Sequence, residues 1–223
     1  ISKCESIISL YGYGRILGEH FSSYVVMEYA QGGDLFDAIE EDLYQNSPEK
    51  INFACGNLVD ALCALQDAKI VHCDIKPENI VLMDRANLES VRLIDFGGAV
   101  DEHSKSGSYT QQYCSPEQQL KAAVNCKSDV FTMGLVFATI INMSYPWSQN
   151  ANEDFLRFIH YNERDPESLP RCRRSRNQWI RSLKNQPTLF HMLQINPGLR
   201  SSAHHIKSLI QKYPVAPPPP TTI

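Results

Sequence analysis

The sequence predicts an α+β fold in which a larger, mostly helical region follows a few short strands. A β-branched and aromatic stretch at residues 21–30 predicts a strand near the N-terminus. Apolar residues recur with helical spacing over residues 47–68, and a long apolar run predicts a helix buried on all sides over residues 126–143. Between these helices, apolar stretches at residues 80–83 and 91–94 flank a polar turn and predict a β-hairpin.

Composition excludes several classes of protein. The 223 residues are 43% hydrophobic and 21% charged, as in a globular protein with a sizeable core. A net charge of -4 and a pI near 6.0 argue against bulk electrostatic binding to nucleic acid or to an anionic membrane. The seven cysteines form no C-x-x-C pair and are expected to be reduced thiols. No signal peptide opens the chain, so we expect a location in the cytoplasm or nucleus.

The ends of the first helices carry start and stop signals. A Gln-Gly-Gly sequence at residues 31–33 ends the first predicted strand, and Asp34 is placed to cap a short helix after it. Ser47 is expected to cap the next helix, which has a proline in its first turn and runs to about residue 68.

The second half of the chain is less regular. Residues 97–115 are polar and predict a long loop. Weaker helical patterns lie near residues 152–162, 177–193 and 201–211. The proline-rich tail at residues 214–223 is expected to be extended and disordered.

Two short motifs in the middle of the chain are informative as a pair. Residues 72–79 are HCDIKPEN, and residues 95–97 are DFG. Either motif occurs often by chance, but here H-x-D-x-K-x-x-N is followed by a predicted hairpin and then by D-F-G. This order resembles the catalytic centre of eukaryotic-type serine/threonine protein kinases.

Phosphoryl transfer requires an oriented hydroxyl and neutralisation of charge, and these residue types can supply both. By the resemblance, Asp74 is the catalytic residue that accepts the proton of the substrate hydroxyl, and Lys76 offsets charge on the transferred group. Asn79 and Asp95 offer hard oxygen ligands, which suit magnesium held against the phosphates of ATP. The implied cofactors are ATP and Mg2+, and the implied partners are protein substrates.

Further landmarks of the same family lie downstream. Residues 113–117, YCSPE, resemble the Ala-Pro-Glu end of the activation segment, and residues 129–134 resemble the D-x-W-x-x-G start of the central buried helix. Arg200 matches the arginine that pairs with the glutamate of the first motif, here Glu117. Thr110 matches the threonine that serine/threonine kinases place near the catalytic aspartate and lysine.

Upstream, residues 25–30, VVMEYA, resemble the hinge that connects the two lobes of a kinase. The resemblance assigns nucleotide-binding positions to the gatekeeper Met27, the adenine-binding backbones of Glu28 and Ala30, Asp34 near the ribose and the incoming peptide, and Val81 under the adenine ring.

The resemblance predicts a partial kinase domain over residues 1–213. Residues 1–30 would be the end of the small lobe and the hinge strand, and residues 31–213 would be the helical lobe. The sequence has no G-x-G-x-x-G and no V-A-x-K, and Gly12 and Gly14 lie where a turn between strands is expected. Because the chain opens on Ile1 rather than methionine, we expect a piece of a longer kinase that is inactive alone.

Cys73 is the main departure from the family pattern. It occupies the position of an arginine that normally pairs with a phosphorylated residue of the activation loop. Without that cation, we expect activity that does not require phosphorylation of this loop.

Two alternatives to an active protein kinase are a pseudokinase, which keeps the fold as a binding module, and a small-molecule kinase. The intact motif residues argue against the first, and the substrate-platform landmarks argue against the second. The basic cluster Arg171–Arg176 is expected either to dock an acidic partner or signal nuclear entry, or to be a solvated insertion.

Overall fold

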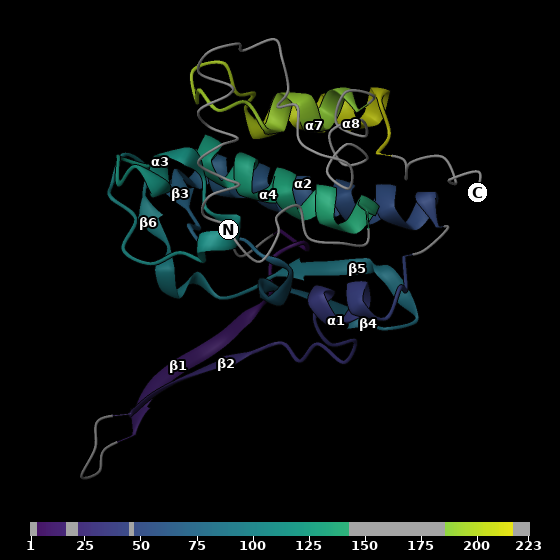
Figure 1. The fold of residues 1–223 in the computed structure, drawn as a ribbon. Helices are drawn as coiled ribbons and strands as arrows, with labels where there is room; N and C mark the ends of the chain where they lie inside the picture. The colour runs from purple at the N-terminus through teal and green to yellow at the C-terminus, as the bar shows by residue number, and fades with distance from the viewer. Residues whose placement is uncertain (1–3, 17–21, 45–46, 143–185, 216–223) are drawn as a thin grey trace.

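The computed structural model describes residues 4–16, 22–44, 47–142 and 186–215 (Figure 1). The described strands form three antiparallel two-stranded sheets, which pair β1 with β2, β3 with β6 and β4 with β5. The strands are β1 (Leu10–Ile16), β2 (Ser22–Met27), β3 (Ile70–Val71), β4 (Ile80–Asp84), β5 (Asn87–Leu93) and β6 (Val100–Asp101). The α-helices are α1 (Leu35–Glu40), α2 (Pro48–Ala68), α3 (Pro116–Gln119), α4 (Cys126–Asn142), α7 (Pro187–Met192) and α8 (Ala203–Lys212). Three short 3-10 helices are η1 (Pro77–Asn79), η2 (Phe96–Gly98) and η3 (Gln111–Tyr113).

Helix α4 is the centre of the core, packed against α2, α7 and α8 (Figure 1). Its residues are buried on every face apart from Lys127 and Asn142, as the apolar run predicts. Gly134 lets α7 approach closely, because a Cβ at this position would lie 2.9 Å from a methyl carbon of Leu193. No helix within the described ranges has both the length and the apolar character needed to cross a membrane.

The starts of α1 and α2 test the two predicted caps. Asp34 Oδ1 accepts the backbone N–H of Asp37 at 2.9 Å, so the predicted cap of α1 is confirmed. Helix α2 begins at Pro48 and ends at Ala68 as expected, but the Ser47 side chain does not form the capping hydrogen bond. The ψ angle of Ser47 is 63°, whereas an N-cap residue typically has the extended backbone from which its side chain reaches the first N–H groups of the helix.

Strands β1 and β2 form a hairpin that projects away from the rest of the molecule (Figure 1). Gly12 and Gly14 lie inside β1, so the turn expected at these glycines is wrong. Gly14 is opposite Tyr24 in the register, and a Cβ on Gly14 would lie 2.5 Å from the tyrosine hydroxyl. The glycine therefore gives room for the Tyr24 ring to cover the neighbouring strand.

The segment after the D-F-G motif has more structure than the predicted loop. It contains β6 and η3, and η2 runs into it from Phe96 of the motif. Strand β6 pairs with β3, with Val100 opposite Val71. This pairing fixes the start of the segment beside the residues that lead into the HCDIKPEN motif.

Helix α7 lies within the helical range predicted over residues 177–193, and α8 lies within the range predicted over residues 201–211 except that it ends one residue later. The helix expected at residues 152–162 lies outside the described residues. Val215 is buried against the main core, so packing continues into the first residues of the proline-rich tail. The six cysteines in the described ranges are free thiols.

Candidate active site

Asp74 and Lys76 lie in the segment between β3 and η1, where they form a compact polar cluster. The Nζ atom of Lys76 lies 2.9 Å from Asp74 Oδ2. The same amine donates to the hydroxyl of Thr110 at 2.8 Å, and the Thr110 backbone N–H donates to Asp74 Oδ1 at 2.8 Å. The structure therefore brings Thr110 to Asp74 and Lys76 across 34 to 36 positions of sequence, as predicted.

The Asp74 carboxyl is in an environment that favours its ionised form. Burial opposes ionisation, but the hydrogen bonds from Lys76 and Thr110 outweigh it and hold the pKa of Asp74 below its ordinary value. The side chain is 19% exposed. An ionised carboxylate that solvent can reach is able to accept a hydrogen bond from an incoming hydroxyl.

Asn79 and Asp95 are held next to each other by the backbone. The Asn79 carbonyl oxygen accepts the N–H of Ile94, the residue before Asp95, at 2.9 Å. The Asn79 amide nitrogen donates to the carbonyl oxygen of Asp74 at 2.8 Å and to its carboxylate at 3.2 Å. These bonds do not use the amide oxygen of Asn79.

Asp95 has a left-handed backbone with φ 62°, which is uncommon for a residue other than glycine. Its Oδ1 accepts the N–H of Gly97 at 3.1 Å, and the residue is exposed. Asp95 and Asn79 together offer carboxylate and amide oxygens. Mg2+ bound to a nucleotide needs only one or two carboxylates besides phosphates and water, so this donor set fits it. Among the residues described, no group of three or more His, Cys, Asp or Glu side chains is arranged to hold a metal by itself.

Asp129, at the start of α4, holds the backbone at the start of the HCDIKPEN motif. It is buried, and its two carboxylate oxygens accept the backbone N–H groups of His72 at 2.7 Å and Cys73 at 3.1 Å. Burial raises the pKa of Asp129 to about 6, against the lowering effect of His72 and the two N–H donors. Cys73 has φ 70°, and these bonds fix that strained backbone. The sequence placed Asp129 on the buried helix but gave no indication of its partners.

His72 connects the HCDIKPEN motif to the D-F-G motif. It is fully buried, and its Nε2 lies 2.9 Å from the carbonyl oxygen of Ile94. Its ring centroid is 4.9 Å from that of Phe96. The first residue of one motif thus packs on the second residue of the other, a contact that spacing alone did not reveal.

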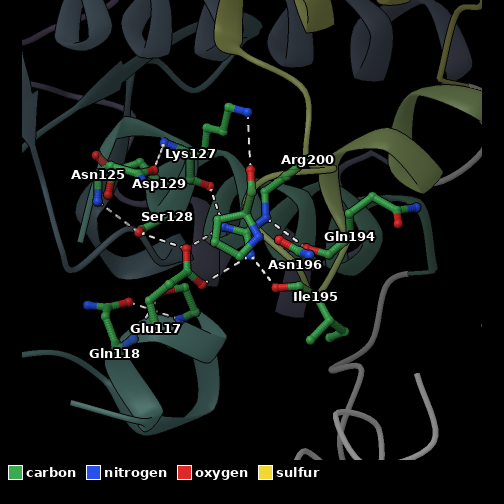
Figure 2. A network of polar contacts seen from close by, with 12 residues as sticks. Glu117, Gln118, Asn125, Lys127, Ser128, Asp129, Gln194, Ile195, Asn196 and Arg200 are labelled. Atoms are coloured by element: carbon green, nitrogen blue, oxygen red, sulfur yellow. Dashed lines mark hydrogen bonds and ion pairs between the residues drawn. The ribbon is translucent and has the colours of Figure 1, made fainter. Parts of the chain in front are cut away.

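The predicted pair between Glu117 and Arg200 is confirmed (Figure 2). The guanidinium binds both carboxylate oxygens, at 2.7 and 3.1 Å, and both residues are buried. Arg200 also donates to three backbone carbonyls, those of Lys127, Gln194 and Ile195. The Ser128 hydroxyl donates to Glu117 at 3.1 Å. Arg200 therefore joins the end of the 97–117 segment to the start of α4 and to the chain after α7.

The uncharged side chain of Gln118 links Cys73 to Ser106 in the segment after the D-F-G motif. Gln118 Nε2 donates to the Cys73 carbonyl oxygen at 2.7 Å and to the Ser106 hydroxyl oxygen at 3.3 Å. Burial raises the pKa of the Cys73 thiol to about 11, so the thiol stays neutral. At Cys73, where the kinase pattern has an arginine, the contacts to this segment are thus hydrogen bonds between uncharged groups.

The expected nucleotide positions lie along the segment that follows β2. Met27 ends β2 and is exposed, while the backbone N–H of Glu28 donates to the Ser9 carbonyl oxygen at 2.9 Å. Asp34 forms an isolated bridge with Val81 on β4, so these two predicted positions lie side by side. Ala30, between Glu28 and Asp34 in sequence, is partly exposed and has no regular secondary structure. The basic cluster Arg171–Arg176 lies outside the described residues and stays a prediction.

Comparison with known proteins shows the class to which this arrangement belongs. Residues 1–210 match the protein kinase domain family, and the chain is therefore a member of that family. The chain is 30% identical over 155 residues to serine/threonine-protein kinase KSP1 of Saccharomyces cerevisiae, covering 64% of this chain and 15% of that protein. It is 29% identical over 203 residues to serine/threonine-protein kinase SBK1 of Danio rerio, covering 86% and 50%. It is 28% identical over 179 residues to serine/threonine-protein kinase ULK1 of Homo sapiens, covering 76% and 17%. The chain thus spans half the length of one of these relatives and less than a fifth of the other two.

Proposed function

We propose that this protein kinase, in the complete protein that its gene encodes, is catalytically active and transfers the γ-phosphoryl group of ATP to serine or threonine hydroxyls of proteins. The observation that carries the proposal is the cluster of Asp74, Lys76 and Thr110, joined through Asn79 to the residue before Asp95. A pseudokinase needs none of these contacts.

In this mechanism Asp74 orients the substrate hydroxyl and accepts its proton as the oxygen attacks. Lys76 offsets negative charge near the transferred group. Asn79 and Asp95 would hold Mg2+, which when bound neutralises charge on the nucleotide phosphates. Thr110 keeps both catalytic side chains in place through its hydroxyl and its N–H.

The choice of serine or threonine as acceptor is supported by Lys76 and Thr110. Lysine two residues after the catalytic aspartate and threonine at position 110 both match the serine/threonine pattern. The relatives named above are serine/threonine kinases by their names.

The direct test is a transfer assay with the complete protein that its gene encodes. We expect label from γ-labelled ATP on serine and threonine of protein substrates in the presence of Mg2+, and loss of this label when a chelator removes the metal. Phosphoamino acid analysis identifies the acceptor. Nucleotide binding without transfer to any acceptor would establish the pseudokinase alternative instead, and label on tyrosine alone would overturn the choice of acceptor.

We further expect that phosphatase treatment leaves the activity unchanged. Cys73 cannot bind a phosphate as an arginine does, and Gln118 already ties Cys73 to Ser106 through uncharged groups. Measuring kcat before and after complete dephosphorylation checks this, and we expect agreement within about twofold. A protein that loses its activity on dephosphorylation, and regains it on rephosphorylation, would contradict the expectation.

A further inference from the structure

Arg92 on β5 forms an ion pair that reaches outside its own hairpin. Its guanidinium binds the carboxylate of Glu28, the residue that directly follows β2. Both side chains are only 23% exposed. A pair this far out of solvent is weakened less by water and salt than a surface pair.

Glu28 begins the segment of residues 28–33 that follows β2. The end of this segment, at Gly32 and Gly33, is bound to the β4–β5 hairpin mainly by backbone hydrogen bonds. Gly32 donates to the Leu82 carbonyl oxygen at 2.9 Å, and the Leu82 N–H donates to Gly33 at 2.9 Å. A Cβ on Gly32 would lie 2.6 Å from Leu82, so only glycine permits this approach. Arg85 adds a bond from its guanidinium to the Gly32 carbonyl oxygen at 2.8 Å.

The start of the segment, at Glu28, is bound to the β4–β5 hairpin by a side chain rather than by the backbone. At Glu28 the backbone N–H donates to Ser9, which lies before β1. The contact from Glu28 to the β4–β5 hairpin is made by its side chain, through Arg92. Arg92 therefore connects the start of this segment to the same hairpin that binds its end.

The register of the β4–β5 hairpin puts Arg92 on the same face as Val81. Arg92 is the cross-strand partner of Val81. Side chains of directly opposite residues lie on the same face of an antiparallel pair. Val81 is the expected floor of the adenine site and also bridges to Asp34. Arg92 and Val81 thus lie side by side. Val81 would lie under the adenine, and Arg92 binds the segment of residues 28–30 that would contact the edge of the adenine.

We propose that Arg92 is a positioning residue for ATP, which acts by fixing Glu28 so that the backbone of residues 28–30 is ready for the adenine. The inference rests on the proposed function, because it gives Arg92 a role in that same nucleotide site. Fixing the backbone before binding reduces the entropy lost when ATP binds, and this is the source of the expected effect on affinity.

The test measures the ATP dependence of Arg92→Met in the complete protein. Loss of one partly buried ion pair is expected to raise the KM for ATP and the dissociation constant for ATP about fivefold, while the KM for the protein substrate is unchanged. Glu28→Gln is expected to give the same change, and the double variant no further change. Arg92→Lys, which keeps the charge, is expected to recover part of the affinity.

Arg15→Gln is the matched control, because Arg15 is exposed on the neighbouring hairpin. If Arg92→Met and wild type bind ATP equally, the inference is overturned while the proposed function stands. If the KM values for ATP and protein substrate rise together, or the melting temperature falls with them, the role is structural and the inference is again overturned. Calorimetric ATP binding decides the role of Arg92 even if no transfer occurs, and a wild type that binds no ATP overturns both proposals.

Discussion

Replacing Asp74 with asparagine is expected to lower kcat about a thousandfold, with little change in the KM for ATP. Asparagine has nearly the same shape, so its side-chain oxygen can still accept the Thr110 N–H that now binds at 2.8 Å. It cannot take up a proton from the substrate hydroxyl, and it loses the charge that pairs with Lys76 at 2.9 Å. The measurement is steady-state kinetics of phosphoryl transfer on the complete protein, with ATP and protein substrate varied separately.

Asp101→Asn serves as the control for this substitution. It makes the same chemical change at an exposed residue of β6, and wild-type kinetics are expected from it. The thermal unfolding of both variants should match wild type within a few degrees, because neither substitution changes the volume of the core. A kcat for Asp74→Asn within about tenfold of wild type would show that Asp74 is not the group that accepts the proton.

The candidate catalytic positions could be singled out from the sequence because they are close together. Asp74, Lys76 and Asn79 lie within six residues, and their order and spacing define them before any folding is considered. Their long-range supports are different. Asp129 binds the backbone of Cys73 across 56 positions, and no local pattern encodes a bond from a side chain to a distant N–H. The pair of Glu28 and Arg92 was missed for the same reason.

Errors at the level of secondary structure also have physical causes. Gly12 and Gly14 were expected in a turn because glycine is common there. The ring of Tyr24 on the opposite strand provides a different reason for Gly14, and only the register reveals it. Ser47 has the right residue type and position for a cap, but its backbone lacks the extended conformation typical of an N-cap and its side chain forms no capping hydrogen bond. Residue type therefore predicted where α2 starts without predicting which group satisfies its first N–H donors.

Replacing Arg200 with methionine is expected to lower the free energy of unfolding by about 3–5 kcal/mol. Methionine fills much of the space beside the Phe131 ring, which lies 4.9 Å from the guanidinium, so cavity formation is minor. What is lost is the partner of a buried carboxylate on Glu117 and the donor for three backbone carbonyls. Unpaired buried charges and acceptors keep their full desolvation cost. Chemical denaturation of wild type and variant, followed by circular dichroism, measures the difference.

Two further variants separate the ion pair from general damage to the fold. Lys207→Met removes another ion pair, with Asp60, but both of its partners are more than 40% exposed, so a loss below about 1 kcal/mol is expected. The double variant Glu117→Gln with Arg200→Met removes the uncompensated charge. It should be more stable than Arg200→Met alone, because a neutral amide costs less to bury than a carboxylate without its cation. If Arg200→Met costs no more than Lys207→Met, the pair does not stabilise the fold. If the double variant is less stable than Arg200→Met, the cost arises from the lost carbonyl contacts and packing rather than from the buried charge of Glu117.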